Sequence, residues 1–153
     1  MGRTLRNVDV WVFAQNVATL AALVLGPVVP GHPWHWSGPV LGVVLVLIGA
    51  AFGLAGVRAL GRNRTPHPKP IEGAQLVTSG VYSLVRHPLY TSLMALALGW
   101  SLLWSSWPAL AAALGLTGLL EAKARLEERW LRETFPDYPA YACRVRRFVP
   151  WLF

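Results

Sequence analysis

The chain has 153 residues, 54% of them hydrophobic and only 14% charged, with a formal net charge of +7. A mean hydropathy of +0.43 with so few charges is untypical of a soluble globular domain and indicates an integral membrane protein. The basic excess does not indicate nucleic-acid binding, because no recognisable binding module accompanies it. The single cysteine, Cys143, excludes an intramolecular disulfide.

Two apolar segments open the chain, at residues 10–29 and 39–57, and neither contains a charge. Each is close to the roughly 20 residues that a helix needs to cross a ~30 Å hydrocarbon core. The N-terminus has no basic region followed by a small-residue cleavage site, so we expect the first segment to be retained rather than removed as a signal peptide. Both segments are predicted transmembrane helices.

Polar and small residues inside these segments predict helix contacts. Gln15, Asn16 and Thr19 interrupt the first segment and are expected to hydrogen-bond to neighbouring helices. The second segment carries Gly42, Gly49, Gly53 and Gly56 close to one helix face. Such a face lets two helices approach closely. It is compatible with packing inside the chain or between two copies, so the oligomeric state stays open.

A third apolar segment, residues 88–120, is 33 residues long. As one helix it would measure about 50 Å, too long for a single crossing. The sequence WSSWP, residues 104–108, offers capping serines, a proline suited to a first helical turn and interfacial tryptophans. It therefore predicts a hairpin of two spans, 88–104 and 107–126, whose second arm continues as a helix through residues 121–135.

All 14 Lys and Arg residues lie at residues 3–6, 58–86 and 123–147, and none lies in the connections 26–38 and 104–107. With four spans, every basic residue falls on one side of the membrane. The positive-inside rule then places both termini in the cytoplasm. We therefore predict one all-α domain, residues 1–153, forming a four-helix bundle in a plasma (inner) membrane with a cytoplasmic loop and a C-terminal helical extension.

Charged residues gather where the third and fourth spans meet the cytoplasm. Arg86, His87 and Tyr90 flank Pro88, so a helix N-terminus there would favour an anionic or polar group. Glu127 and Glu128 lie on the extension of the last helix and could converge with Arg86. The simpler alternatives are that Arg86 anchors at lipid headgroups and that the glutamates pair along their own helix, as Glu128 with Arg132 or Glu121 with Arg125. His32 and His35 have no acidic or thiol companion, so we predict no metal site.

Two motifs carry a family resemblance. LVTSGVYSLVRHPLY, residues 76–90, is followed by a hydrophobic hairpin and by EERWLRETFPDYPAYACRVRRFVP, residues 127–150. From about residue 73 onward the chain closely resembles the isoprenylcysteine carboxyl methyltransferase family and its bacterial relatives. The resemblance implies an integral membrane enzyme that transfers a methyl group from S-adenosylmethionine to a lipid-borne acceptor, which in eukaryotic members is the carboxylate of a prenylated cysteine.

The resemblance also implies site residues, in the regions 73–90 and 121–147. Those implied for the cofactor are Ala74, Gln75, Leu76, Val77, Tyr82, His87, Pro88, Leu89, Tyr90 and Glu127. Arg86, His87 and Glu127 are the expected catalytic residues. Lys123 stands where the family has a carboxylate-binding arginine, and it keeps the charge but not the planar two-pronged match. Arg125 lies nearby in sequence and could substitute.

Three further interpretations stay open at this stage. The acceptor could be a phospholipid amine, because phospholipid N-methyltransferases share the architecture and the terminal Glu-Glu pair. An amine or thiol acceptor would need a general base, and His87 is then the candidate. The chain could instead be a reductase that uses NADPH, since membrane sterol reductases resemble the same region. Finally, it could be a non-enzymatic membrane protein with a relict motif.

Overall fold

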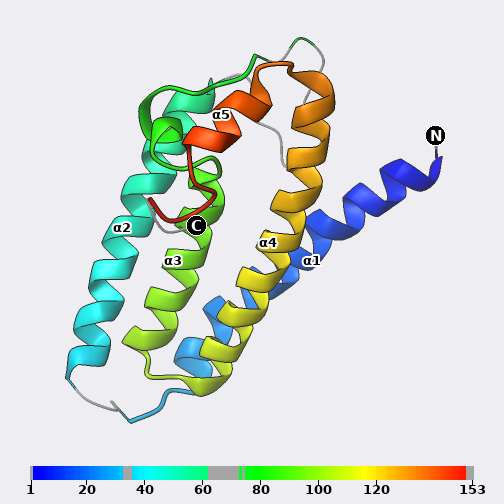
Figure 1. Ribbon diagram of the computed structural model, residues 1–153. Coiled ribbons are helices and arrows are strands. Elements are labelled where there is room, and N and C mark those ends of the chain that lie inside the picture. The colour runs from blue at the N-terminus through cyan, green and yellow to red at the C-terminus, as the bar shows by residue number, and fades with distance from the viewer. Residues whose placement is uncertain (1, 33–35, 62–72, 74, 151–153) are drawn as a thin grey trace.

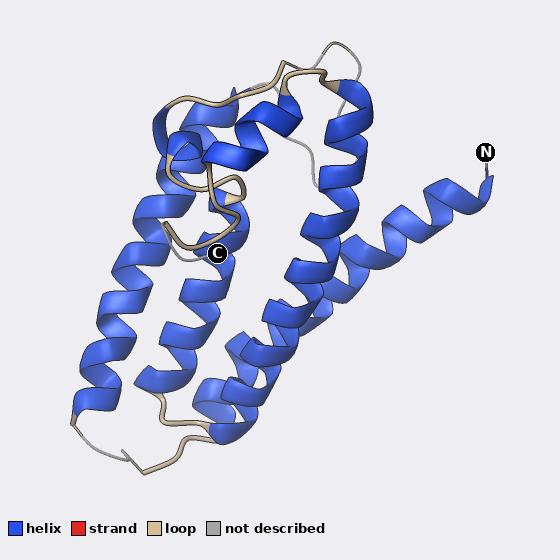
Figure 2. Cartoon of the chain, in the orientation of Figure 1, coloured by secondary structure: helices blue, strands red, loops and turns tan. Residues whose placement is uncertain are grey.

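The computed structural model describes residues 2–32, 36–61, 73 and 75–150, with side chains from Val10 onward (Figure 1). It contains the α-helices α1 (Gly2–Val28), α2 (Ser37–Leu60), α3 (Pro88–Leu103), α4 (Trp107–Thr134) and α5 (Tyr138–Arg144) and the short 3-10 helix η2 (Gly80–Ser83). The described residues form no strand, and one isolated bridge joins Val85 to Arg146 (Figure 2). The prediction of an all-α fold is therefore confirmed.

The helical hairpin of α3 and α4 breaks where the sequence predicts. The Ser106 hydroxyl accepts a hydrogen bond from the Ala109 backbone N–H at 3.4 Å, and Pro108 lies in the first turn of α4. Such a cap satisfies one of the free N–H groups at a helix start. α4 then continues through the charged sequence to Thr134, as predicted.

Glycines fix the contact between α2 and α3. Gly42, Gly49 and Gly56 are buried along one face of α2. A Cβ atom on Gly42 would lie 2.8 Å from the carbonyl oxygen of Gly99 in α3, and one on Gly49 would lie 2.9 Å from that of Ser92. The two backbones thus approach too closely for any side chain. The buried glycines of α2 therefore pack against α3 within the chain.

Adding a methyl group to this face is expected to destabilise the protein. Gly42→Ala places a Cβ against a backbone carbonyl, and overpacking of this kind costs about 1–3 kcal/mol. Gly118→Ala, inside α4 where nothing lies within 4 Å, should instead be neutral or stabilising by up to about 1 kcal/mol. Thermal unfolding of both variants in detergent should show a lower melting temperature for Gly42→Ala alone, and equal shifts would contradict the packing.

The helix α1 packs against α4 and α3, and Ala22 joins Leu116, Leu120 and Met94 in the hydrophobic core. Its N-terminal part runs away from α4 (Figure 1). The outward surfaces are apolar, as Phe13, which is 70% exposed, illustrates. Two helical stretches, Val10–Val28 and Ser37–Leu60, are long and apolar enough to cross a membrane, whereas Pro88–Leu103 is apolar but shorter.

The C-terminal segment folds back onto the start of α3. The backbone N–H of Arg86 donates to the Arg146 carbonyl at 2.8 Å, and that of His87 donates to the Arg147 carbonyl at 3.1 Å. The Thr91 hydroxyl donates to the Phe148 carbonyl at 2.9 Å. These bonds bring the Arg-His-Pro sequence, the C-terminal segment and the charged part of α4 to one end of the bundle (Figure 1).

Candidate active site

Glu128 is the centre of the charged cluster at this end of the bundle. Its side chain is 1% exposed and accepts hydrogen bonds from Arg86 (Nε at 3.1 Å, Nη2 at 3.0 Å). Arg147 adds two parallel bonds, Nε at 2.9 Å and Nη2 at 3.0 Å, one to each carboxylate oxygen. The predicted convergence of Arg86 with the terminal glutamates is confirmed, and the alternative that Arg86 merely anchors at headgroups is wrong.

The cluster is fully paired, which explains how charges persist in a buried position. Arg86 also donates to the carbonyls of Ala142 at 2.7 Å and Val145 at 2.6 Å. Burial alone would raise the pKa of Glu128, but hydrogen bonds from His87 and Arg147 and the charges around it hold that pKa well below its usual range. Glu128 is therefore an ionised carboxylate that joins α4 to the two segments packed against it.

Glu127 has different surroundings from its neighbour. Its side chain is 27% exposed, and it accepts a hydrogen bond from the Tyr90 hydroxyl at 2.7 Å. His87 lies between the two glutamates, with Nδ1 3.8 Å from Glu127 and Nε2 3.2 Å from Glu128. The His87 ring stacks on that of Tyr90 at 5.3 Å between centroids. Glu127 is thus an oriented carboxylate that a ligand can reach.

Lys123 lies one helical turn before Glu127 and is 2% exposed. Its Nζ atom donates to Gln15 Oε1 of α1 at 2.7 Å and lies 5.5 Å from the centroid of the Tyr90 ring. The prediction that Gln15 hydrogen-bonds to another helix is confirmed. Thr19 instead donates to the Gln15 carbonyl within α1, and Asn16 is exposed.

Buried tyrosines line the side of the cluster toward α5. The Tyr141 hydroxyl donates to the Tyr82 carbonyl at 2.6 Å, and burial raises the pKa of Tyr141 to about 12. Tyr138 is 1% exposed, and its hydroxyl has no hydrogen-bond partner among the described residues. The Arg132 guanidinium lies 5.9 Å from the centroid of the Tyr138 ring. The hydrogen bond from Tyr141 thus holds Tyr82 by its backbone carbonyl.

The other residues implied by the resemblance have different surroundings. Leu89 faces α2, where its Cδ2 atom lies 2.8 Å from the position of a Cβ on Gly56, and Pro88 is buried at the same contact. Arg125 is 66% exposed and pairs with Glu121 at 2.7 Å, so it does not join Lys123. Gln75 is exposed, whereas Leu76 and Val77 are partly buried; Ala74 lies outside the described residues.

Sequence reasoning missed Arg147. It bridges Glu128 and Glu121, with Nη1 2.6 Å from Glu121 Oε1, and the only available signal was its place in a basic C-terminal run. The predicted pairing of glutamates along α4 is confirmed for Glu121 with Arg125 and for Glu128 with Arg132 at 3.5 Å.

No group of three His, Cys, Asp or Glu side chains among the described residues is arranged to hold a metal. His32 is exposed, and His35 lies outside the described residues.

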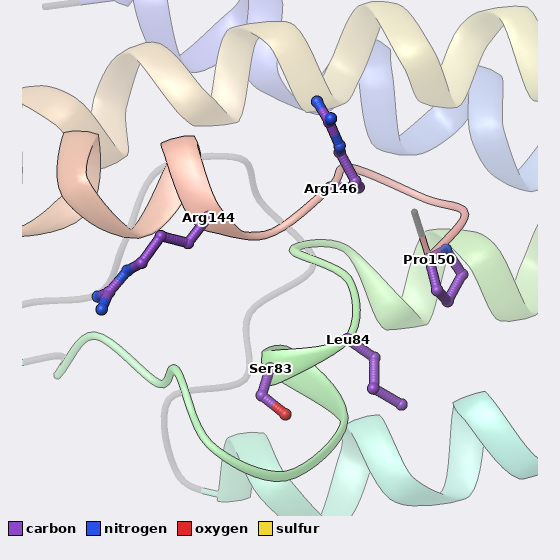
Figure 3. Close-up of a pocket in the computed structure, with 5 residues that line it drawn as sticks. All are labelled: Ser83, Leu84, Arg144, Arg146 and Pro150. Atoms are coloured by element: carbon purple, nitrogen blue, oxygen red, sulfur yellow. The ribbon is translucent and has the colours of Figure 1, made fainter. Parts of the chain in front are cut away.

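A surface pocket of about 280 Å³ opens beside the cluster, and its lining residues are Ser83, Leu84, Arg144, Arg146 and Pro150. In Figure 3 the side chain of Arg146 extends away from Ser83 and Leu84. The Ser83 hydroxyl is already bonded to the Gly80 carbonyl at 2.7 Å. The pocket contains none of the predicted catalytic residues.

Comparison with known proteins identifies related sequences. The sequence profile of the phospholipid methyltransferase family matches residues 38–138. A cobalt-zinc-cadmium resistance protein of Cupriavidus metallidurans is 31% identical over 97% of this chain and 66% of its own length. A probable protein-S-isoprenylcysteine O-methyltransferase of Oryza sativa subsp. indica is 30% identical over 93% of this chain and 76% of its own length. Protein-S-isoprenylcysteine O-methyltransferase B of Arabidopsis thaliana is 30% identical over 80% of this chain and 64% of its own length.

This chain therefore spans about two thirds to three quarters of the relatives compared. The profile match covers most of the chain, from the start of α2 to the start of α5, and includes Arg86, His87, Glu127 and Glu128. It confirms the resemblance carried by the two sequence motifs. The chain belongs to the phospholipid methyltransferase family, and methyl transfer is the chemistry of that family.

Proposed function

We propose that this chain is an integral membrane enzyme that transfers a methyl group from S-adenosylmethionine to the carboxylate of a lipid-borne, isoprenylcysteine-like acceptor. The observation that carries the proposal is the arrangement around Glu127. A reachable carboxylate is oriented by Tyr90 and His87, while the buried cation Lys123 lies one turn away. A negative and a positive group side by side suit a cationic donor and an anionic acceptor.

The residues present fit S-adenosylmethionine. Its sulfonium and ammonium groups need an anion and aromatic faces. Glu127 supplies the anion, and its Oε2 atom is already aligned by the Tyr90 hydroxyl at 2.7 Å. The stacked pair of His87 and Tyr90 supplies flat aromatic surface next to it. Glu128 is not available for this role, because five hydrogen bonds from Arg86, His87 and Arg147 occupy its oxygens.

The bound donor supplies a methyl group on a positively charged sulfur, which leaves as a neutral thioether. The protein's task is then to hold acceptor and methyl group in line at a near-attack distance. Lys123 attracts the acceptor carboxylate, and Glu127 fixes the cationic end of the donor. A carboxylate has no proton to lose, so no general base is required. His87 needs no proton-transfer role in this scheme, and its Nε2 atom lies 3.2 Å from the buried Glu128 carboxylate.

A phospholipid amine is the second candidate acceptor. The description of the matching family, phospholipid methyltransferase, favours it. An amine acceptor would need a general base, and His87 is the candidate for that role. The names of the rice and Arabidopsis relatives support the carboxylate, as does the buried cation Lys123. An NADPH-dependent reductase and a relict without activity receive no support from the comparisons.

We also propose a membrane topology for the chain. α1 and α2 cross the membrane, and α3 with the first part of α4 adds two further crossings, giving four spans with both termini in the cytoplasm of a plasma (inner) membrane. The distribution of Lys and Arg supports this arrangement. The site then lies at the cytoplasmic edge, where a water-soluble donor and a lipid-borne acceptor can both reach it, in a single domain covering residues 1–153.

Calorimetric titration of the detergent-purified protein tests the donor. We expect saturable binding of S-adenosylmethionine and none of NADPH. Labelled S-adenosylmethionine with a prenylcysteine should then give a base-labile methyl ester, whereas a phospholipid acceptor would give a base-stable N-methyl product. Binding of NADPH alone would contradict the proposal and favour a reductase.

A further inference from the structure

The C-terminal segment contacts His87 at two points. The Arg147 carbonyl accepts a hydrogen bond from the His87 backbone N–H at 3.1 Å. The next residue, Phe148, places its ring 5.9 Å from the His87 ring between centroids, with 47° between the planes. Consecutive residues of one segment therefore hold the backbone and the side chain of the same histidine. The family profile matches residues 38–138, so this segment lies beyond the matched residues.

The place of His87 in the chain explains why such contacts matter. His87 is the N-cap of α3, with φ −125° and ψ 62°, and its side chain makes no capping hydrogen bond. An N-cap residue lies outside the helical geometry that begins with the residue after it. The helix therefore does not fix the direction of the His87 ring. That direction depends on the groups packed around the ring.

Two rings and two carboxylates lie around the His87 side chain, which is 4% exposed. The Tyr90 ring stacks on it at 5.3 Å, with 3° between the planes. Its nitrogens lie 3.8 Å from Glu127 and 3.2 Å from Glu128. The Tyr90 hydroxyl also aligns Glu127 at 2.7 Å. A change in the direction of the His87 ring would therefore disturb the stacked Tyr90 ring and the carboxylate that Tyr90 orients.

Phe148 is itself firmly held. Its carbonyl accepts a hydrogen bond from the Thr91 hydroxyl at 2.9 Å. Its partly buried side chain packs against the hydrophobic core that includes Met94 and Leu120. The preceding residue, Arg147, forms an ion pair with Glu128 at 2.9 Å. A ring with so little freedom restricts the ring that it touches.

We propose that Phe148 is a positioning residue that restrains the His87 ring in its stack with Tyr90 and so keeps Glu127 directed toward the cationic end of the methyl donor. The inference rests on the proposed function, because the donor is the ligand that Glu127 would hold. It gives the C-terminal segment a part in donor binding. If Phe148 served packing alone, its loss would lower stability and leave donor affinity unchanged.

Two substitutions at Phe148 test this role. Phe148→Leu keeps an apolar side chain but removes the ring, and we expect it to weaken binding of S-adenosylmethionine by about 3- to 10-fold, the range that corresponds to one aromatic pair. Phe148→Tyr keeps the ring and should bind within about twofold of the wild type. Calorimetric titration measures the affinities, and thermal unfolding in detergent gives the stability of each variant.

Two controls separate positioning from loss of stability. Val149→Ala changes the neighbouring side chain, which is 47% exposed, and should leave affinity and stability unchanged. Gly42→Ala disturbs the contact of α2 with α3, so it should melt earlier and still bind the donor as the wild type does. Wild-type affinity in Phe148→Leu would overturn the proposal. An equal loss of affinity in Phe148→Tyr or Gly42→Ala would overturn it as well, because the loss would not depend on the ring.

NMR of the ligand-free protein tests the arrangement without the donor. With the His87 ring signals assigned by comparison with His87→Gln, we expect a nuclear Overhauser contact between the His87 and Phe148 rings in the wild type. Those signals should shift in Phe148→Leu and not in Val149→Ala. Absence of the contact would overturn the proposal even if no variant folded. If the wild type showed the contact but bound no S-adenosylmethionine, the proposed function would fail; donor binding unaffected by Phe148→Leu would refute the role of Phe148 alone.

Discussion

Replacing Glu128 by Ala should destabilise the protein more than any other single substitution in the site, by about 3–5 kcal/mol. The carboxylate is 1% exposed and is the common partner of Arg86 and Arg147. Without this carboxylate, the guanidinium groups of Arg86 and Arg147 lose their common partner. The loss also uncouples α4 from both segments packed against its end, since Arg86 lies just before α3 and Arg147 belongs to the C-terminal segment.

Thermal unfolding in detergent measures this effect, with Glu133→Ala as the control. Glu133 is on the same helix but exposed, so its removal should change stability by less than about 0.5 kcal/mol. Glu128→Gln should fall between the two, because it keeps hydrogen-bonding capacity and loses the charge. A melting temperature for Glu128→Ala within error of the control would show that the cluster does not stabilise the fold.

The sequence predicted those parts of the fold that depend on local chemistry. The break before α4 follows from Ser106 and Pro108, and both occupy the expected cap and first turn. The glycines of α2 could be assigned to a packing face because their spacing places them together on a helix. Their partner was not predictable from that spacing: the close approach of Gly42 to Gly99 requires the register between two helices.

The sequence allowed a prediction of which segments meet at the site, but not of which atoms are in contact there. That Arg86 would converge with the terminal glutamates followed from their positions at adjacent helix ends. The choice of Glu128 over Glu127 did not, because adjacent helix residues differ by about 100° in direction and the sequence gives no absolute rotation. The pairs Gln15 with Lys123 and Arg147 with Glu121 depend on tertiary packing. Arg125 illustrates the same limit, since two positions from Lys123 it lies exposed.

Substitution of Glu127 should reduce donor binding and leave stability nearly unchanged, whereas substitution of Glu128 mainly reduces stability. Glu127→Gln is expected to lower affinity for S-adenosylmethionine by about 10- to 100-fold, as loss of a charged hydrogen-bond partner does. Its effect on stability should stay below about 1 kcal/mol, because Tyr90 can still donate to the amide oxygen. The change is confined to charge, and it leaves the ion pairs of Glu128 intact.

Calorimetric titration and thermal unfolding of Glu127→Gln and Glu128→Gln, done in parallel, separate the two roles. The first variant should melt like the wild type and fail to bind the donor; the second should melt earlier, and its remaining folded fraction should still bind. Tyr90→Phe refines the test, because it removes the hydroxyl that orients Glu127 at 2.7 Å and should give an intermediate loss of donor affinity. Full donor binding by Glu127→Gln would place the donor elsewhere on the protein. Loss of donor binding with unchanged stability in Glu127→Gln would show that the two consecutive glutamates have separate roles. Glu128 joins three segments into a fold, and Glu127 presents a charge to the ligand.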